Sequence, residues 1–345
     1  MNSSPQVAQT WFAGRQLQRL TPLIMLGLLA GLCGCGNSSG SFAETVHVTT
    51  FAKSSKGKYT QPDSITFNAD SVFVGYGNGV STTGSDGKSS TVVQYTKSGK
   101  KVTTFKVKGH NDGLKIDPAT GLLWAMQNED ANPNLVIIDV TTGTQTVYTF
   151  GVNPCGGGYD DIVFDGGKVF VSCSNPANNP NTGAAIVSVT LAGTTATVTP
   201  VLMGNASAVN KVTGKTVTLN LQDPDSMILD PSGVLVLDSQ ADSELIFITN
   251  PDSPGQTVKV LPITFFGTPT QLDDTVFPTS PVGTILVADR DGETVYAIQG
   301  SSFPTSGSGF SATGSTVSQL NLATGALSVV VNGLVSSHGM AFIPR

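Results

Sequence analysis

Short apolar segments alternate with polar turns along most of this chain. One unit shows the order clearly: an apolar segment at residues 112–116, a turn containing proline and glycine, and a second apolar segment at residues 122–126. Residues 135–144 then indicate a hairpin that turns at Thr142-Gly143. Segments rich in Val, Ile, Thr and Phe between turn residues are typical of β-strands. The pattern therefore predicts four short antiparallel strands in this unit.

The first strand of this unit recurs along the chain, and each copy begins with an anchor residue that is aspartate or, in the last copy, histidine. The spacings between successive anchors are 49, 48, 65, 48 and 65 residues. A four-stranded unit that repeats with such a period is typical of a β-propeller, in which each unit forms one blade. The anchor residues are Asp63, Asp112, Asp160, Asp225, Asp273 and His338.

Six anchors predict an all-β fold, a six-bladed β-propeller of four-stranded antiparallel blades spanning residues 44–345. The chain continues for only seven residues after His338, so we expect residues 45–51 to complete the sixth sheet and close the ring. A sixth blade with few strands and a five-bladed ring with an extra strand pair are the two alternatives. Further second strands are predicted at residues 71–74, 168–172, 234–237 and 284–288, and surface loops at residues 174–182, 204–216 and 300–314.

The composition agrees with an all-β fold and narrows the classes of partner. Only 12% of the residues are charged, while 39 are glycine and 19 are proline, which suits many short strands joined by tight turns. The net charge is −6, and we expect the few cationic residues to be spread along the chain rather than clustered. Without a cluster of Lys and Arg there is no surface for a phosphate backbone, so nucleic acid is not an expected partner.

The N-terminus carries an export signal. Arg15 and Arg19 precede an apolar run at residues 23–32 that contains only apolar residues and glycine. A basic flank, a short apolar segment and small residues after it are typical of a signal peptide, and the segment is too short to span a bilayer.

The end of that signal, Leu32-Cys33-Gly34-Cys35, resembles the lipobox of bacterial lipoproteins. The resemblance implies that residues 1–34 are a signal peptide and that Cys35 is the acylated first residue of the mature chain. Residues 35–43 would then form a flexible tether, and Gly36 would direct the protein to the outer membrane. An ordinary secretory signal with two incidental cysteines is the alternative.

Two further cysteines, Cys155 and Cys173, flank the third anchor. If residues 160–165 and 168–173 form a hairpin that turns at Gly166-Gly167, Cys173 ends close to the loop that carries Cys155. We therefore expect a disulfide, which would persist in an exported protein. A pair of buried free thiols is the alternative.

The anchor residues are the candidate functional residues. The first strand of each propeller blade lines the central channel, so equivalent positions should meet at one mouth of the channel. Five carboxylates in a small space repel one another, and some should bind protons or a hard cation, for which calcium is better suited than zinc. The alternative is structural, because an aspartate at a strand entry can accept hydrogen bonds from nearby backbone N–H groups.

Two motifs suggest a family. Asn111-Asp112-Gly113 followed by Asp117-Pro118, and Pro224-Asp225-Ser226-Met227 followed by Asp230-Pro231, resemble signatures of the gluconolactonase/regucalcin propellers. That family is related to strictosidine synthase and the paraoxonases and is similar to NHL-repeat propellers. The resemblance implies a divalent cation, often calcium, in the channel and the hydrolysis of a lactone or ester beside it.

The resemblance also implies roles for single residues. Asp225 would be a metal ligand and the general base, and Asn111 a polar contact to the substrate. Asp63 stands where the family has a glutamate ligand and Asp160 where it has asparagine, so the implied metal site is Asp63, Asn111, Asp160 and Asp225. The family's arginine two residues before Asn111 is replaced by Gly109.

We also count His110 and His338, together with Asp225, as candidate catalytic residues, and Asp112 and Asp273 as candidate ligand-binding residues. The leading hypothesis is a lipid-anchored propeller of the bacterial cell envelope that binds a small-molecule ligand or an envelope protein. A calcium-dependent lactonase or esterase is the alternative from the enzyme class. A purely structural scaffold is the third hypothesis.

Overall fold

We describe residues 46–345 of a computed structural model. The predicted signal peptide, the acylation site Cys35 and the tether lie outside the described residues. The regular structure in residues 46–345 consists of strands and one short 3-10 helix, Gln240–Asp242. This part of the chain contains no helix of the length and hydropathy that crossing a membrane requires.

The strands form six antiparallel four-stranded blades, as predicted. Blades 2 and 3 are joined into one sheet by a short parallel pairing of β13 with β9. Blade 1 contains β2 (Pro62–Phe67), β3 (Ser71–Tyr76), β4 (Ser89–Thr96) and β5 (Lys101–Lys108); blade 2 contains β6 (Asn111–Ile116), β7 (Leu123–Gln127), β8 (Asn134–Ile138) and β9 (Gln145–Phe150); blade 3 contains β10 (Ile162–Asp165), β11 (Lys168–Ser172), β12 (Ala184–Ala192) and β13 (Thr195–Met203).

The remaining blades are less regular. The β14–β15 hairpin extends the sheet of blade 4 through a parallel contact of β14 with β19. Blade 4 contains β16 (Pro224–Leu229), β17 (Leu235–Ser239), β18 (Glu244–Thr249) and β19 (Thr257–Pro262), with β14 (Ser207–Asn210) and β15 (Thr216–Thr218); blade 5 contains β22 (Thr275–Val276), β25 (Ser308–Thr313), β26 (Thr316–Asn321) and β27 (Leu327–Asn332); blade 6 contains β28 (Ser337–Pro344), β23 (Gly283–Asp289), β24 (Thr294–Gln299) and β1 (His47–Lys53); β20 (Thr264–Phe265) and β21 (Thr268–Pro269) form a separate hairpin.

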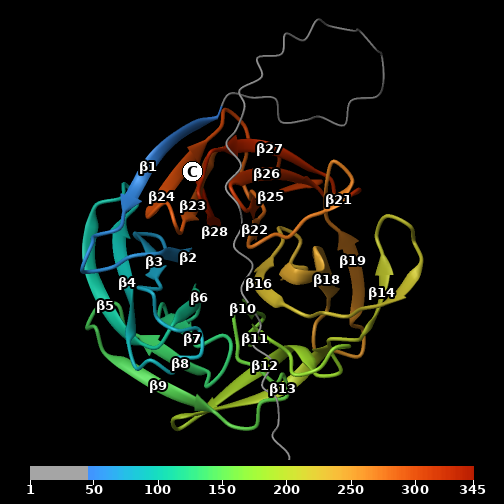
Figure 1. The fold of residues 1–345 in the computed structure, drawn as a ribbon, viewed down its shortest axis with the longest axis horizontal. Helices are drawn as coiled ribbons and strands as arrows, with labels where there is room; N and C mark the ends of the chain where they lie inside the picture. The colour runs from blue at the N-terminus through green and yellow to red at the C-terminus, as the bar shows by residue number, and fades with distance from the viewer. Residues whose placement is uncertain (1–45) are drawn as a thin grey trace, which may run out of the picture. The chain divides into compact units, whose positions relative to one another are not determined.

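The inner strands close the ring. Contacts run in a circle from β2 to β6, β10, β16, β22 and β28 and back to β2. Figure 1 shows these strands around the centre, with the other strands of each blade farther out. Apolar side chains fill the space between neighbouring blades, as where Phe73 and Phe105 of blade 1 pack with Leu114 of blade 2. The predicted fold class is therefore confirmed.

Blade 6 is built from both ends of the described chain. β28 is its innermost strand and β1 its outermost strand, so the prediction that the N- and C-terminal strands close the ring is confirmed. In this sheet His47 pairs with Gln299, and Lys53 pairs with Thr294.

Blades 5 and 6 exchange strands, which the sequence did not predict. Residues 284–288 form a strand, but this strand, β23, lies in blade 6 rather than beside β22. β22 instead pairs with β25, so the prediction of a surface loop at residues 300–314 was wrong for residues 308–313 and held for residues 300–307. Phe310 of β25 is fully buried. The sequence indicates a strand only weakly here, because β25 has the sequence Ser-Gly-Phe-Ser-Ala-Thr, with only one large apolar residue.

The other two predicted loops had different outcomes. No strand lies between the end of β11 and the start of β12, so residues 174–182 are a loop as expected. Residues 204–216 contain β14 and the first residue of β15, so the loop prediction was wrong there for part of the segment.

The residue after each anchor links neighbouring inner strands. Asp161 of blade 3 accepts a hydrogen bond from the backbone N–H of Met227 in blade 4 at 2.9 Å. Asp274 of blade 5 accepts one from Met340 of blade 6 at 2.6 Å. In blade 2 this position is Gly113, where a Cβ atom would lie 2.1 Å from the carbonyl oxygen of Asp160. In blade 2, the close approach of the neighbouring inner strand therefore requires glycine at residue 113.

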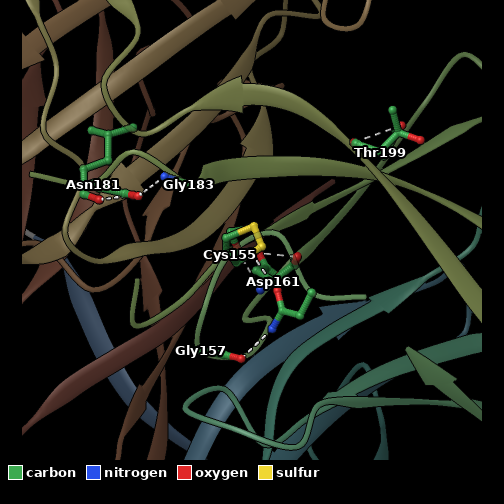
Figure 2. Close-up of a disulfide and its surroundings, with 11 residues drawn as sticks. Cys155, Gly157, Asp161, Asn181, Gly183 and Thr199 are labelled. Atoms are coloured by element: carbon green, nitrogen blue, oxygen red, sulfur yellow. Dashed lines mark hydrogen bonds between the residues drawn. A yellow bond between two sulfur atoms is a disulfide. The ribbon is translucent and has the colours of Figure 1, made fainter. Parts of the chain in front are cut away.

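The disulfide between Cys155 and Cys173 is present, as predicted, with a Cα–Cα distance of 5.4 Å. Both cysteines are buried in the apolar cluster between blades 2 and 3. Figure 2 shows the disulfide close to Asp161, whose N–H donates to the hydroxyl of Ser172 at 2.8 Å. Closing a loop of this size stabilises a fold by about 3 kcal/mol on a chain-entropy argument. The disulfide thus supports the strand that positions Asp160 and Asp161.

Candidate functional site

The six anchor residues line one cavity at a mouth of the channel, which we call the mouth cavity. Its volume is about 230 Å³, and each anchor reaches it from the start of an inner strand or, for Asp160 and Asp273, from two residues before the strand. The repeat places these residues together because successive blades are related by rotation about the channel. The anchors that line the cavity are Asp63, Asp112, Asp160, Asp225, Asp273 and His338.

Carboxylates greatly outnumber cations in this lining. The cationic or potentially cationic side chains are those of His110, Lys115, Arg290 and His338. Five further acidic residues of the lining were not predicted from the sequence, although the repeat of Asp-Asp at positions 160–161 and 273–274 and the polar ends of the second strands offered a signal. These residues are Glu129, Asp130, Asp161, Asp223 and Asp274.

His338 lies between two anchor carboxylates. Its Nδ1 atom is 2.8 Å from Oδ2 of Asp273 and 3.5 Å from Oδ1 of Asp63. Burial by itself lowers the pKa of His338, but the two carboxylates outweigh burial and raise this pKa to about 11. For Asp63, burial by itself raises the pKa, but the charges of His338 and Arg290 hold this pKa below its usual value. His338 is therefore an imidazolium that neutralises this side of the cavity at neutral pH.

Ser336, His338 and Asp273 are connected in the order of a Ser-His-Asp triad. Oγ of Ser336 is 3.1 Å from Nε2 of His338. A catalytic triad needs a neutral imidazole that accepts the serine proton. Because the pKa of His338 is raised to about 11, its Nε2 carries a proton and donates to the hydroxyl. Ser336 also does not line the mouth cavity, so the arrangement does not favour a serine hydrolase.

Three anchors form no such ion pair with a cationic side chain of residues 46–345. Burial, together with the charges of neighbouring carboxylates, raises the pKa of Asp112, Asp160 and Asp225 well above the usual value. Nε2 of Gln240 donates to Oδ2 of Asp225 at 3.0 Å and so fixes the orientation of that carboxyl group. The raised pKa values favour the protonated form of these carboxyl groups in the absence of a bound cation.

His110 lies at the edge of this acidic group. Its Nδ1 atom is 2.7 Å from Oε2 of Glu129, and its Nε2 atom is buried without a hydrogen-bond partner among residues 46–345. Burial and the charge of Asp63 contribute to a pKa of about 7 for Glu129.

Two sets of side chains bring possible ligand atoms within 4.8 Å of one another: His110 with Asp112 and Glu129, and Asp63 with Asp273 and His338. Asp160 and Asp225 line the same cavity but belong to neither set.

Asn111 is placed differently from the other residues of the implied metal site. Its side chain is fully buried, and Nδ2 donates to the carbonyl oxygen of Met126 at 2.9 Å. Its Oδ1 atom lies 2.3 Å from the position that a Cβ atom of Gly75 would occupy, so this side chain packs against β3. Asn111 does not line the mouth cavity, whereas Asp63, Asp160 and Asp225 do.

No protein family and no curated protein matches this chain in sequence. Several solved structures are similar in fold. A gluconolactonase from Xanthomonas campestris has 9% identity and a TM-score of 0.51, with 85% of this chain and 82% of that chain covered. A protein of unknown function from Bacteroides caccae has 9% identity and a TM-score of 0.50, with coverage of 84% and 89%. The periplasmic gluconolactonase of Pseudomonas aeruginosa has 10% identity and a TM-score of 0.47, with coverage of 82% and 88%. The likenesses to the Xanthomonas campestris and Bacteroides caccae proteins show the fold alone.

Proposed function

We propose that this protein binds a divalent cation, calcium by preference, at the mouth of its channel and uses that site to hold a small polar ligand at the bacterial cell envelope. The observation that carries the proposal is the group of anchor carboxylates, Asp112, Asp160 and Asp225, which form no ion pair with any cationic side chain of residues 46–345. Calcium takes six to eight oxygen ligands and suits carboxylates better than it suits histidine. A divalent cation would replace the protons that these groups otherwise hold.

Carboxylate oxygens are the donors that calcium prefers, and Asp112 would take the place that the family resemblance implies for Asn111. Asp63 contributes less to such a site because it already faces His338 and Arg290. A bound cation would polarise a carbonyl or phosphoryl oxygen of the ligand. Arg290 lines the same cavity and would offer N–H donors to an anionic group of that ligand, while His338 adds positive charge. The cavity thus suits a small molecule that carries both an oxygen donor for calcium and a negative charge.

Calcium titration calorimetry with elemental analysis of the purified protein tests the proposal. We expect Asp225→Asn to weaken calcium binding by about tenfold or more, because a charged oxygen ligand is replaced by a neutral one. Asp70→Asn is the matched control, since Asp70 is exposed and does not line the cavity. Failure of the wild-type protein to bind calcium would contradict the proposal.

We also infer from the lipobox resemblance that the protein is anchored through a lipid on Cys35. In the described residues, Lys53 at the end of β1 pairs with Thr294, and Thr294 pairs with Asp289. Asp289 pairs with Ser337 beside the cavity, so His47, at the start of β1, lies at the end of the strand away from the mouth. Metabolic labelling with a radioactive fatty acid should label the wild type and not Cys35→Ser.

Hydrolysis of a lactone or ester is the second candidate function. It is supported by the position of Asp225 in the cavity, held by Gln240, where it could act as a general base, and by the fold likeness to a gluconolactonase. The burial of Asn111 away from the cavity favours binding over hydrolysis. A lactone panel assayed with calcium separates the two functions: turnover that Asp225→Asn abolishes would establish the enzyme.

A further inference from the structure

We propose a second binding site, for an acidic oligosaccharide, on the outer part of blade 1. Lys58, Lys101 and Lys106 line a concave surface of about 450 Å³ there, which we call the lysine site. It shares no residue with the mouth cavity and does not depend on the cation proposed there.

The distribution of charge sets blade 1 apart from the rest of the propeller. Residues 53–108 contain nine lysines and three aspartates, although the whole chain has a net charge of −6. The expectation that cationic residues are spread along the chain was therefore wrong. One of the three aspartates, Asp63, lies in the mouth cavity, so its charge faces the channel. The outer part of blade 1 is thus a basic surface on an acidic protein, which attracts anions.

The register of β5 places two of the lysines on one face. Residues 101 and 106 are five apart, and a regular strand would point them in opposite directions. Lys106 pairs with Thr91, and a bulge lets Lys101 pair with Tyr95. Thr91 and Tyr95 are four residues apart in β4, so they lie on the same face of the strand. Lys58 comes from the connection between β1 and β2, which the Ser55–Tyr59 bridge holds over this face. The three lysines therefore line one depression.

The other lining residues indicate the kind of anion. None of them is acidic, and Lys101 Nζ lies 5.8 Å from the centre of the Tyr59 ring. Nδ2 of Asn78 donates to the hydroxyl of Thr91 at 2.9 Å and to the carbonyl oxygen of Ser89 at 3.1 Å, which orders the floor of the site. The remaining lining residues are Tyr59, Asn78, Ser89, Thr91 and Thr104.

This combination suits a sugar chain that carries negative charges. The volume of the site falls in the range of pockets for small molecules, well above what one inorganic anion fills. Lysine ammonium groups pair with carboxylates, while hydroxyl groups of Ser and Thr exchange hydrogen bonds with the hydroxyl groups of a sugar. The depression is too confined for the long basic stripe that a nucleic-acid backbone needs.

Calorimetry with tetragalacturonic acid as the probe and maltotetraose as the neutral control tests the site. We expect binding of the acidic probe, weakened by salt, and no binding of the neutral one. The double variant Lys101→Gln and Lys106→Gln should lower affinity for tetragalacturonic acid by about tenfold or more, since it removes two charge-assisted contacts. The matched control is Lys215→Gln with Lys259→Gln, which removes two exposed lysines of blade 4 and its hairpin.

Equal binding by the two double variants would overturn the proposal, as would absence of binding by the wild type. Binding of maltotetraose as strong as that of the acidic probe would also overturn it. Tripolyphosphate is a third probe: a site that binds it and not the sugar acid recognises phosphate instead. Lys101 and Lys106 are exposed, so the variant should unfold at the same temperature as the wild type. Should it melt earlier, Lys58→Gln provides a second test of the same loss.

Discussion

His338 occupies the one anchor position that is not aspartate, and it decides the charge of its side of the mouth cavity. Its imidazolium holds the pKa of Asp63 below its usual value, whereas Asp112, Asp160 and Asp225, without such a partner, have raised pKa values. One repeated position therefore produces two chemically different halves of a single cavity. The glycine that follows the anchor in blades 2 and 6 shows a second effect at this scale, because backbone atoms of the neighbouring strand occupy the space of its missing side chain.

The first prediction concerns His338 and pH. Its pKa is raised above the unfolded value of about 6.5 to about 11, so its stabilisation is complete below pH 6.5 and is lost as the pH rises toward 11. The wild type should lose stability relative to His338→Gln over this range, by at most about 1.4 kcal/mol per pH unit. Urea unfolding of both proteins at pH 6, 8 and 10 measures the difference. A constant difference would mean that folding does not shift the pKa of His338.

The second prediction concerns Gly113. A Cβ atom there would lie 2.1 Å from the carbonyl oxygen of Asp160, so Gly113→Ala should force the inner strands of blades 2 and 3 apart. We expect a loss of stability of about 1–3 kcal/mol or more, as for other overpacked sites. Gly151→Ala is the control, since a Cβ atom at that position has nothing within 4 Å. Thermal and urea unfolding should show a loss only for Gly113→Ala.

Among the strands, the exchange between blades 5 and 6 is the main feature that the repeat did not predict. The chain forms β22 in blade 5, crosses to blade 6 for β23 and β24, and returns to blade 5 for β25 to β27. Each of these blades therefore depends on strands whose chain connections lead through the other. The exchange also explains how a chain with few residues after His338 completes its sixth sheet.

The third prediction tests this exchange. Phe310 of β25 is fully buried, and its ring lies 5.6 Å from that of Phe303. Phe310→Ala should therefore cost about 3–5 kcal/mol of stability, as for large aromatic residues in a core. Val329→Ala on the nearby strand β27 is the control, because Val329 is 42% exposed. Equal unfolding free energies for the two variants would mean that Phe310 is not part of the core and that β25 lies at the surface.

Across the propeller as a whole, charge is separated. Carboxylates gather at the mouth, while lysines gather on the outer part of blade 1, and the disulfide braces the third blade. The mouth cavity and the lysine site are separate sites on one ring, so a cation and an acidic ligand need not compete for the same residues.

The fourth prediction concerns the folded protein as a unit. Calcium at about a hundred times its dissociation constant should stabilise it by about 2.7 kcal/mol. The effect should be larger at pH 8 than at pH 5, because protons compete for carboxyl groups whose pKa values are raised. Thermal unfolding at both pH values, with magnesium as the comparison ion, measures the shift. A calcium effect that is equal at both values would argue against these carboxylates as ligands.

The features that repeat could be predicted from the order of residues. The anchor positions, the six blades, the closure of the ring by the terminal strands and the disulfide all followed from spacing and local pattern, since neighbouring blades repeat the same backbone pairing. The same periodicity predicted that Asp63, Asp112, Asp160, Asp225, Asp273 and His338 would be close together.

Four features became known only from the folded arrangement: which of these groups are charged, where Asn111 points, which sheet receives β23 and β25, and which lysines meet. Protonation depends on burial and on distances between residues of different blades. The partner of each strand, and the face on which each residue of a bulged strand lies, depend on contacts between residues far apart in sequence. A local pattern contains none of those distances.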